Sequence, residues 1–171
     1  MTNLQGLYMS EKDLELLTFL HKVKVASYAQ IGRDIYCGYH KDSVGKRLRK
    51  LEDNRLIHGG RNRLLCNGKK IVSLTKHGFD SFIKNGTEVR IELKSDAKQH
   101  DLVLVDIRHH FLKSAKTLRY ATENQIQTYG FNSSERDIAS FLTLNSDAVI
   151  ELKFSTSNIL IPIEYEGSLK K

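Results

Sequence analysis

The sequence predicts an α+β protein with two domains, and three patterns support this prediction. Apolar residues recur at helical spacing three times between residues 10 and 54. Short apolar runs around turn residues then predict two β-hairpins, one of which ends the chain. The charge is also uneven, because residues 40–76 carry 11 Lys and Arg against 3 Asp and Glu, whereas residues 87–171 carry 11 against 12. We therefore expect a basic domain over 1–86 and a second domain over 87–171.

Two short helices are expected first. A helix over 11–22 begins after Ser10, which forms a cap-like start with Asp13 three residues later. Its apolar side chains recur at helical spacing: Leu14, Leu16, Leu17, Leu20 and Val23. A second helix is expected over 27–36 for the same reason, and Gly38 ends it.

A third helix, over 40–54, is expected to be strongly basic. Its apolar residues on one side are Val44, Leu48 and Leu51, and the other positions hold Lys41, Lys46, Arg47, Arg49 and Lys50. Short helices joined by a short turn are typical of a helix-turn-helix, whose second helix enters the major groove of DNA.

A basic hairpin is expected directly after this helix. Asn67-Gly68 stands between two short apolar runs, and both residues tolerate the positive φ of a two-residue type I′ turn. Basic residues lie on both sides, so we expect this hairpin to be the wing of a winged helix. Thr75 is then expected to cap a fourth helix over 76–84, which Asn85-Gly86 ends.

The stretch Ser-Leu-Thr-Lys-His-Gly-Phe-Asp at 73–80 resembles the passage from hairpin to last helix in many bacterial winged-helix domains. This resemblance covers residues 10–86 and implies binding to duplex DNA. The residues expected to reach bases or phosphates are His40, Lys41, Ser43, Lys46, Arg47, Lys50, Arg61, Arg63, Lys69 and Lys70. The alternative is that these positive side chains form an ordinary solvated surface.

The second domain is expected to begin with a helix over 98–113, followed by a strand over 117–126 and a short helix over 133–141. His100 lies on the apolar stripe of the first of these helices, in its first turn. It is expected either to pack in the core or to face an acidic site on the adjoining sheet.

The terminal hairpin is expected to gather three carboxylates. With its turn centred on Thr156-Ser157, Asp147 stands directly across from Glu166, and Glu164 lies on the diagonal. Like charges in this arrangement call for a cation, and hard divalent ions such as Mg²⁺ or Mn²⁺ prefer carboxylate oxygens. The alternative is that this acidic face is simply solvated.

Several short motifs resemble the replication-relaxation proteins of mobile plasmids, which include the MobC-type relaxases. They are the winged helix, His100-Asp101-Leu102, Ser146-Asp147-Ala148 and Ile-Glu-Tyr-Glu-Gly-Ser at 163–168. The resemblance spans residues 10–171 and implies that the second domain is similar to the PD-(D/E)XK restriction-endonuclease fold. It implies Asp147 and Glu164 as metal ligands, Glu166 at the position of the usual lysine, and Lys170 as a displaced catalytic cation.

This chain departs from that family pattern in three ways. Ser146 stands where the motif has proline, and Glu166 replaces the lysine. The chain also stops just after its motif, which indicates a truncated nuclease sheet.

The leading functional hypothesis is a plasmid mobilisation relaxase that binds origin-of-transfer DNA and makes a Mg²⁺- or Mn²⁺-dependent single-strand nick. Its catalytic residues would be Asp147, Glu164, Glu166, Lys170 and His100. The alternative is a non-catalytic DNA-binding regulator or accessory protein of plasmid replication or mobilisation. A tyrosine nucleophile is a third option that no local motif supports.

The expected partners are double-stranded DNA and an accessory mobilisation protein. No apolar run approaches the roughly 18 residues of a membrane span, and the N-terminus has no signal pattern. A cytoplasmic protein is therefore expected.

Overall fold

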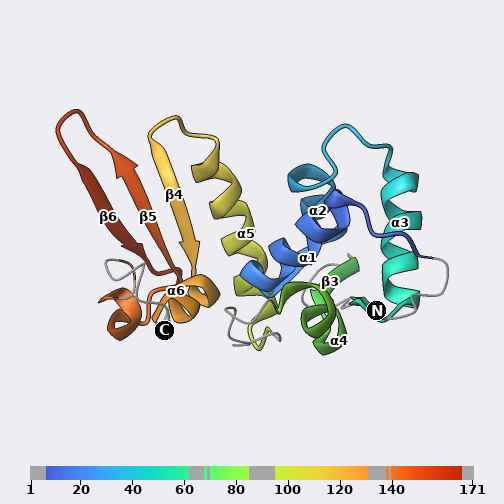
Figure 1. Cartoon of the computed structure of the whole chain (residues 1–171). Helices are drawn as coiled ribbons and strands as arrows, with labels where there is room; N and C mark the ends of the chain where they lie inside the picture. Colours follow the sequence, from blue (N-terminus) through green and yellow to red (C-terminus); the bar gives the residue numbers. More distant parts are fainter. Residues whose placement is uncertain are drawn as a thin grey trace. The chain divides into compact units, whose positions relative to one another are not determined.

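The computed structural model describes residues 7–61, 68, 70–84, 95–130, 138 and 140–166. These residues form an α+β fold with two three-stranded antiparallel sheets (Figure 1). The chain divides into two compact units, residues 1–102 and 103–171. The expected domain boundary between residues 86 and 87 lies outside the described residues.

The three helices expected near the N-terminus are present in the first unit. They are α1 (Glu11–Val23), α2 (Tyr28–Asp34) and α3 (Lys41–Asp53). A capping box starts α1: the Asp13 amide donates to Ser10 Oγ at 3.3 Å, and the Ser10 amide donates to Asp13 Oδ2 at 2.7 Å. Ser27 and Gln30 start α2 in the same way. Local capping chemistry therefore sets both helix starts.

The first sheet has the order β1-β3-β2, with antiparallel pairing throughout. Its strands are β1 (Val25–Ser27), β2 (Ile57–Arg61) and β3 (Lys70–Leu74). The sequence did not indicate β1, because three residues are too few for a pattern of alternation. The side chains without solvent exposure in this unit's core include Leu16, Leu17, Leu20, Ile31, Leu48, Leu51, Leu56 and Phe79.

The strands β2 and β3 pair antiparallel from Ile57 with Leu74 to Arg61 with Lys70. The turn expected at Asn67-Gly68 is described only at Gly68, which has the positive φ of 74° that a turn glycine permits. Residues 62–67 and 69 lie outside the described residues.

Thr75 caps the next helical segment, as expected. Its Oγ1 accepts from the Gly78 amide at 2.9 Å, and α4 (Lys76–Gly78) continues into a π-helical turn over Phe79–Ile83. Gly78 lies so close to Leu56, which directly precedes β2, that a Cβ there would stand 2.2 Å from the Leu56 carbonyl oxygen. This glycine thus lets two segments of backbone approach each other.

The second unit contains one sheet and helices on both of its faces. The boundary between the units falls within α5 (Lys98–Leu112). The further elements of the second unit are β4 (Thr117–Thr122), α6 (Glu123–Gly130), a 3₁₀-helix (Ser140–Leu144), β5 (Ala148–Lys153) and β6 (Asn158–Ile163). The sheet order is β4-β5-β6. No helix within the described part of the chain has both the length and the apolar character that a membrane crossing requires.

The strand expected over 117–126 is correct only to Thr122. The Thr122 amide donates to Gln125 Oε1 at 3.2 Å, which is the reciprocal half of a Thr-x-x-Gln capping box. This local signal starts α6 at Glu123, and the second half of the expected strand is therefore helical. Most of the helix expected over 133–141 lies outside the described residues.

Both faces of the second sheet are covered. On one face, Tyr120, Ala148 and Ile150 pack with Ile107 and Phe111 of α5. The other face contributes Ala121 and Val149, which pack with Ile126, Ile138 and Phe141. The face of β5 that was expected to be acidic therefore carries apolar core.

The register of the terminal hairpin differs from the expected one. Ala148 pairs with Ile163 and Lys153 with Asn158, so the turn is centred on Ser155-Thr156. The expected centre was one residue later, which displaces every cross-strand pair by two residues. Asp147 facing Glu166 is therefore wrong, because the last pair of the ladder joins Ala148 to Ile163 and β6 ends there.

Candidate nucleic-acid interface

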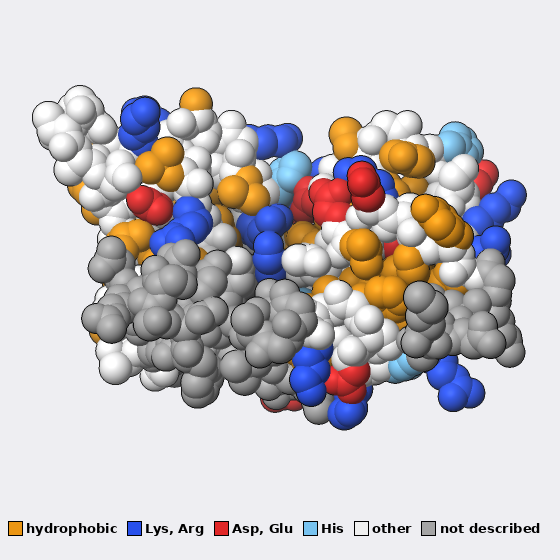
Figure 2. Space-filling model, in the orientation of Figure 1, with side chains coloured by type: hydrophobic (Ala, Val, Ile, Leu, Met, Phe, Trp, Pro, Cys, Tyr) orange, Lys and Arg blue, Asp and Glu red, His pale blue; other side chains and the backbone are white. Residues whose placement is uncertain are grey.

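The helix α3 presents a basic face to solvent. Val44, Leu48 and Leu51 are buried on its inner side, which turns the intervening positions outward. The exposed side chains there are Ser43, Lys46, Arg49 and Lys50. Figure 2 shows Lys and Arg side chains, in blue, at the α3 edge of the first unit. Arg49 was not among the expected DNA contacts, although its spacing of three residues from Lys46 places the two on one face.

The start of α3 adds two more exposed side chains. His40 is the N-cap, and its Nδ1 accepts from the Asp42 amide at 3.4 Å. The same ring nitrogen lies 3.7 Å from the Asp42 carboxylate. Lys41 is exposed. Because the cap position and the helix dipole both favour an acceptor here, part of the role of His40 is to start α3.

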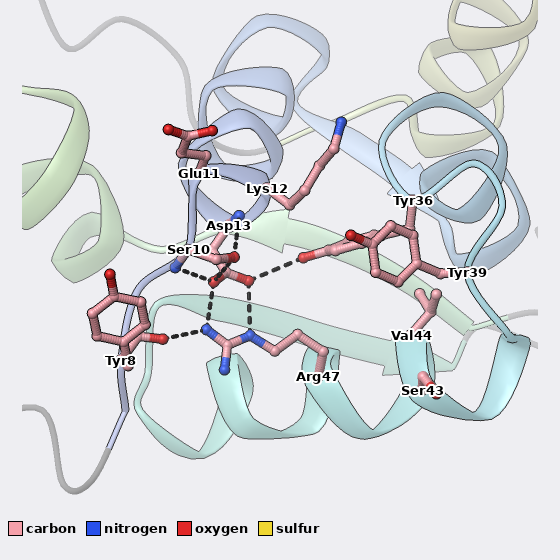
Figure 3. Close-up of a pocket in the computed structure, with 10 residues that line it drawn as sticks. All are labelled: Tyr8, Ser10, Glu11, Lys12, Asp13, Tyr36, Tyr39, Ser43, Val44 and Arg47. Carbon is pink, nitrogen blue, oxygen red and sulfur yellow. Dashed lines mark hydrogen bonds and ion pairs between the residues drawn. The ribbon is translucent and has the colours of Figure 1, made fainter.

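Arg47 does not belong to the exposed face. Its Nε donates to Asp13 Oδ1 at 2.8 Å, its Nη2 donates to Asp13 Oδ2, and Nη2 also donates to the Tyr8 carbonyl oxygen at 2.6 Å (Figure 3). The Asp13 side chain is 0% exposed and the Arg47 side chain 25% exposed. This guanidinium therefore joins α3 to the start of α1, and the DNA contact expected of Arg47 stays a prediction.

The Asp13 carboxylate has five hydrogen bonds. Besides the two from Arg47, it accepts from the Ser10 amide at 2.7 Å, from Ser10 Oγ at 2.6 Å and from Tyr36 Oη at 3.0 Å. Burial opposes the charged carboxylate, but the hydrogen bonds from Arg47 and Ser10 outweigh it and lower the pKa of Asp13. Burial and the neighbouring Asp13 charge raise the pKa of Tyr36. Asp13 is therefore ionised in the folded protein.

The hairpin residues expected at DNA divide into two groups. Lys70 Nζ lies 3.7 Å from Glu52 Oε2 and 5.2 Å from the centre of the Tyr28 ring, so it is held by an ion pair and a cation–π contact. Arg63 and Lys69 lie outside the described residues, and Arg61 is described for its backbone alone.

In the second unit, Asp147 is tied to its neighbours. Its Oδ2 accepts from the Tyr165 amide at 2.7 Å, its amide donates to Ile163 O, and its carbonyl accepts from the Glu123 amide, both at 2.9 Å. These bonds connect the start of β5 with the start of α6 and with the chain that leaves β6. Asp147 thus has a clear structural role.

Of the other residues expected in a nuclease site, Glu164 stands between Ile163 and Tyr165, whose backbone groups both bond to Asp147. Glu164 and Glu166 are exposed beyond the end of β6, and Lys170 lies outside the described residues. His100 is half-buried in the first turn of α5, with Nδ1 3.3 Å from Asp101 Oδ1. Asp147 instead borders a cavity of about 130 Å³ together with Glu123.

Within the described ranges, no three His, Cys, Asp or Glu side chains are grouped so that they could hold a metal ion. The donor set expected from Asp147, Glu164 and Glu166 therefore does not fit a divalent ion as these residues stand.

Comparisons with known proteins found no matching family model, no matching curated protein and no matching solved structure.

Proposed function

We propose that the first unit binds duplex DNA as a winged helix, with α3 as its recognition helix. Its elements follow one another as helix, strand, two helices, hairpin and helix, and the short strand β1 pairs with β3 of the hairpin. This order supports the proposal, because a winged helix packs its hairpin beside a helix-turn-helix. The single observation that carries it is the exposed set Lys46, Arg49 and Lys50 on a helix whose opposite side is buried.

Different residues have different roles in this proposal. Lys46, Arg49 and Lys50 contact phosphates or base edges, and Lys41 with His40 contacts the backbone at the start of α3. Arg47 fixes the angle of α3 against α1 through Asp13. Lys70, which is held by Glu52 and Tyr28, contributes positive electrostatic potential and makes no contact with a base.

The resemblance to replication-relaxation proteins gives this proposal its biological setting. The DNA target would then be the origin of transfer of a plasmid, and an accessory mobilisation protein would bind the same DNA.

Strand nicking by the second unit is a second proposal. It rests on that resemblance and on the position of Asp147 beside Glu123 at a small cavity. The fold family implies Mg²⁺ or Mn²⁺, but the described donors do not fit such an ion, and we derive no catalytic step through one. The non-catalytic DNA-binding regulator is therefore the function that the described geometry supports best.

A binding experiment tests the first proposal. Fluorescence anisotropy with a labelled duplex compares the wild type with a variant carrying Lys46→Ala, Arg49→Ala and Lys50→Ala. The matched control replaces three exposed lysines, two in the α5–β4 connection and one at the end of β5: Lys113, Lys116 and Lys153. The proposal expects loss of most of the affinity in the first variant and near-wild-type affinity in the control. Equal affinity of all three proteins would reject α3 as the DNA-binding element.

A nicking experiment separates the two proposals. Supercoiled plasmid is incubated with the protein and Mg²⁺ or Mn²⁺, with and without chelator, and with Asp147→Asn. Nicks that disappear in both controls would support metal-dependent cleavage, whereas duplex binding without nicks is the result expected of a regulator.

A further inference from the structure

The first unit contains a cavity of about 640 Å³ that DNA binding through α3 does not use. It lies where the start of α1, the α2–α3 connection and α3 meet, and Figure 3 shows Tyr8 on one side of the Asp13–Arg47 pair with Tyr36 and Tyr39 on the other. Its volume falls within the roughly 300–1,000 Å³ of small-molecule sites. The size alone admits a ligand of moderate size.

Aromatic side chains dominate the open part of this cavity. Tyr8 is 85% exposed and Tyr39 is 58% exposed. The rings of Tyr36 and Tyr39 meet edge to face, with centres 5.8 Å apart and an interplanar angle of 82°. Exposed rings beside a fixed ring pair offer a stacking surface for another planar ring.

The charged groups select the polar part of a ligand. Asp13 already accepts five hydrogen bonds and has no capacity for a ligand cation. Arg47 uses Nε and Nη2, whereas its Nη1 donates no hydrogen bond within the part of the chain that the structure describes. Glu11 and Lys12 also line the cavity, and Lys12 Nζ pairs with Glu15 at 2.6 Å. The donors at the cavity are then the Arg47 guanidinium, the Lys12 ammonium and the phenol groups of Tyr8 and Tyr39, and a carboxylate is their strongest acceptor.

From these observations we propose that the cavity is a binding site for a small aromatic carboxylate, whose ring packs on Tyr39 and whose acidic group pairs with Arg47. This site goes beyond DNA recognition and does not depend on it. Such a ligand would touch the side chain that joins α3 to α1, so occupancy is coupled to the attachment of the basic helix.

Protein NMR without DNA tests the site with three probes of matched size. Benzoate is an aromatic anion, cyclohexanecarboxylate an anion without a planar ring, and benzylammonium an aromatic cation. Saturable shifts of amides around Tyr8, Tyr39 and Ser43 are expected with benzoate, at least five-fold weaker binding with cyclohexanecarboxylate, and no binding with benzylammonium. Equal binding of all three probes, or no saturable shift with benzoate, would overturn the proposal.

Two variants locate the binding. Tyr39→Ala removes a largely exposed ring without disturbing the core, and it should weaken benzoate about five-fold, within the range of single aromatic contacts. Phe154→Ala removes another exposed ring, in the β5–β6 turn of the second unit, and should leave benzoate binding unchanged. Unchanged binding in Tyr39→Ala would place benzoate elsewhere and reject the site. Failure of duplex binding would leave this result intact, because no arm of the experiment uses DNA.

Discussion

Replacement of Arg47 should chiefly damage the stability of the first unit. Arg47 supplies two of the five hydrogen bonds to Asp13, whose side chain has no solvent exposure. Arg47→Ala leaves a buried carboxylate with Ser10 and Tyr36 as its remaining donors. Lys46, an exposed lysine of the same helix, has no ion-pair partner among the described residues and provides the matched control.

The expected loss follows from the burial of the pair. Breaking a buried ion pair by removing one partner costs about 3–5 kcal/mol. Arg47 is 25% exposed, and Ser10 and Tyr36 still donate hydrogen bonds to Asp13. We therefore expect a loss at the lower end of this range, about 3 kcal/mol. Domains are stable by about 5–15 kcal/mol in total, so this is a large fraction. Lys46→Ala should stay within about 0.5 kcal/mol of the wild type.

Urea unfolding followed by circular dichroism measures both variants. Since the chain has two units, amide hydrogen exchange in α1 and α3 is measured alongside, to assign the loss to the first unit. The reasoning predicts a lower midpoint and faster exchange in both helices for Arg47→Ala alone. A loss below about 1 kcal/mol for Arg47→Ala, indistinguishable from Lys46→Ala, would refute it.

Three further predictions follow from single contacts. The pKa of Asp13 is lowered in the folded protein, so the stability from its pair with Arg47 should be complete above pH 3.8 and should decline as the pH falls through the folded pKa. The loss of stability in Arg47→Ala, measured by urea unfolding, should therefore be smaller at pH 3 than at pH 7. An equal loss at both pH values would contradict this. Gly78→Ala should destabilise the protein by more than about 2 kcal/mol in the same assay, because the new Cβ would stand 2.2 Å from the Leu56 carbonyl oxygen. Gly45→Ala, which has open space around the new methyl group, should not destabilise it, and similar losses in both variants would rule out the close approach. Tyr120→Phe should be neutral or stabilising by up to about 1 kcal/mol in urea unfolding. Burial raises the pKa of Tyr120 to about 12, and its Oη has no hydrogen-bond partner among the described residues. A clear loss of stability would reveal such a partner.

Local signals explain how well the sequence predicted the helices. The Ser10–Asp13 cap, the Thr75 cap and the spacing of Val44, Leu48 and Leu51 depend on residues within one or two turns of each other. Such short-range patterns can be recognised without knowledge of the rest of the fold. Where a cap was overlooked, as at Thr122 with Gln125, the predicted element was wrong.

Features that depend on distant contacts could not be predicted in the same way. The register of the terminal hairpin differed because turn composition does not specify how many residues the loop contains, and a shift of one residue in this turn separated Asp147 from Glu166. The bond between Arg47 and Asp13 joins residues 34 positions apart. One sequence feature does point to it: Asp13 precedes Leu16, Leu17 and Leu20 on the buried side of α1, where an acidic residue requires a partner.

The salt dependence of duplex binding tests directly whether α3 binds DNA through Lys46, Arg49 and Lys50. Each phosphate contact contributes about −0.9 to the slope of log affinity against log salt concentration. We expect the variant with alanine at all three positions to have a slope shallower by about 2–3 than that of the wild type, whereas the variant lacking Lys113, Lys116 and Lys153 should keep the wild-type slope. An unchanged slope in the α3 variant, or an equal change in both, would contradict it.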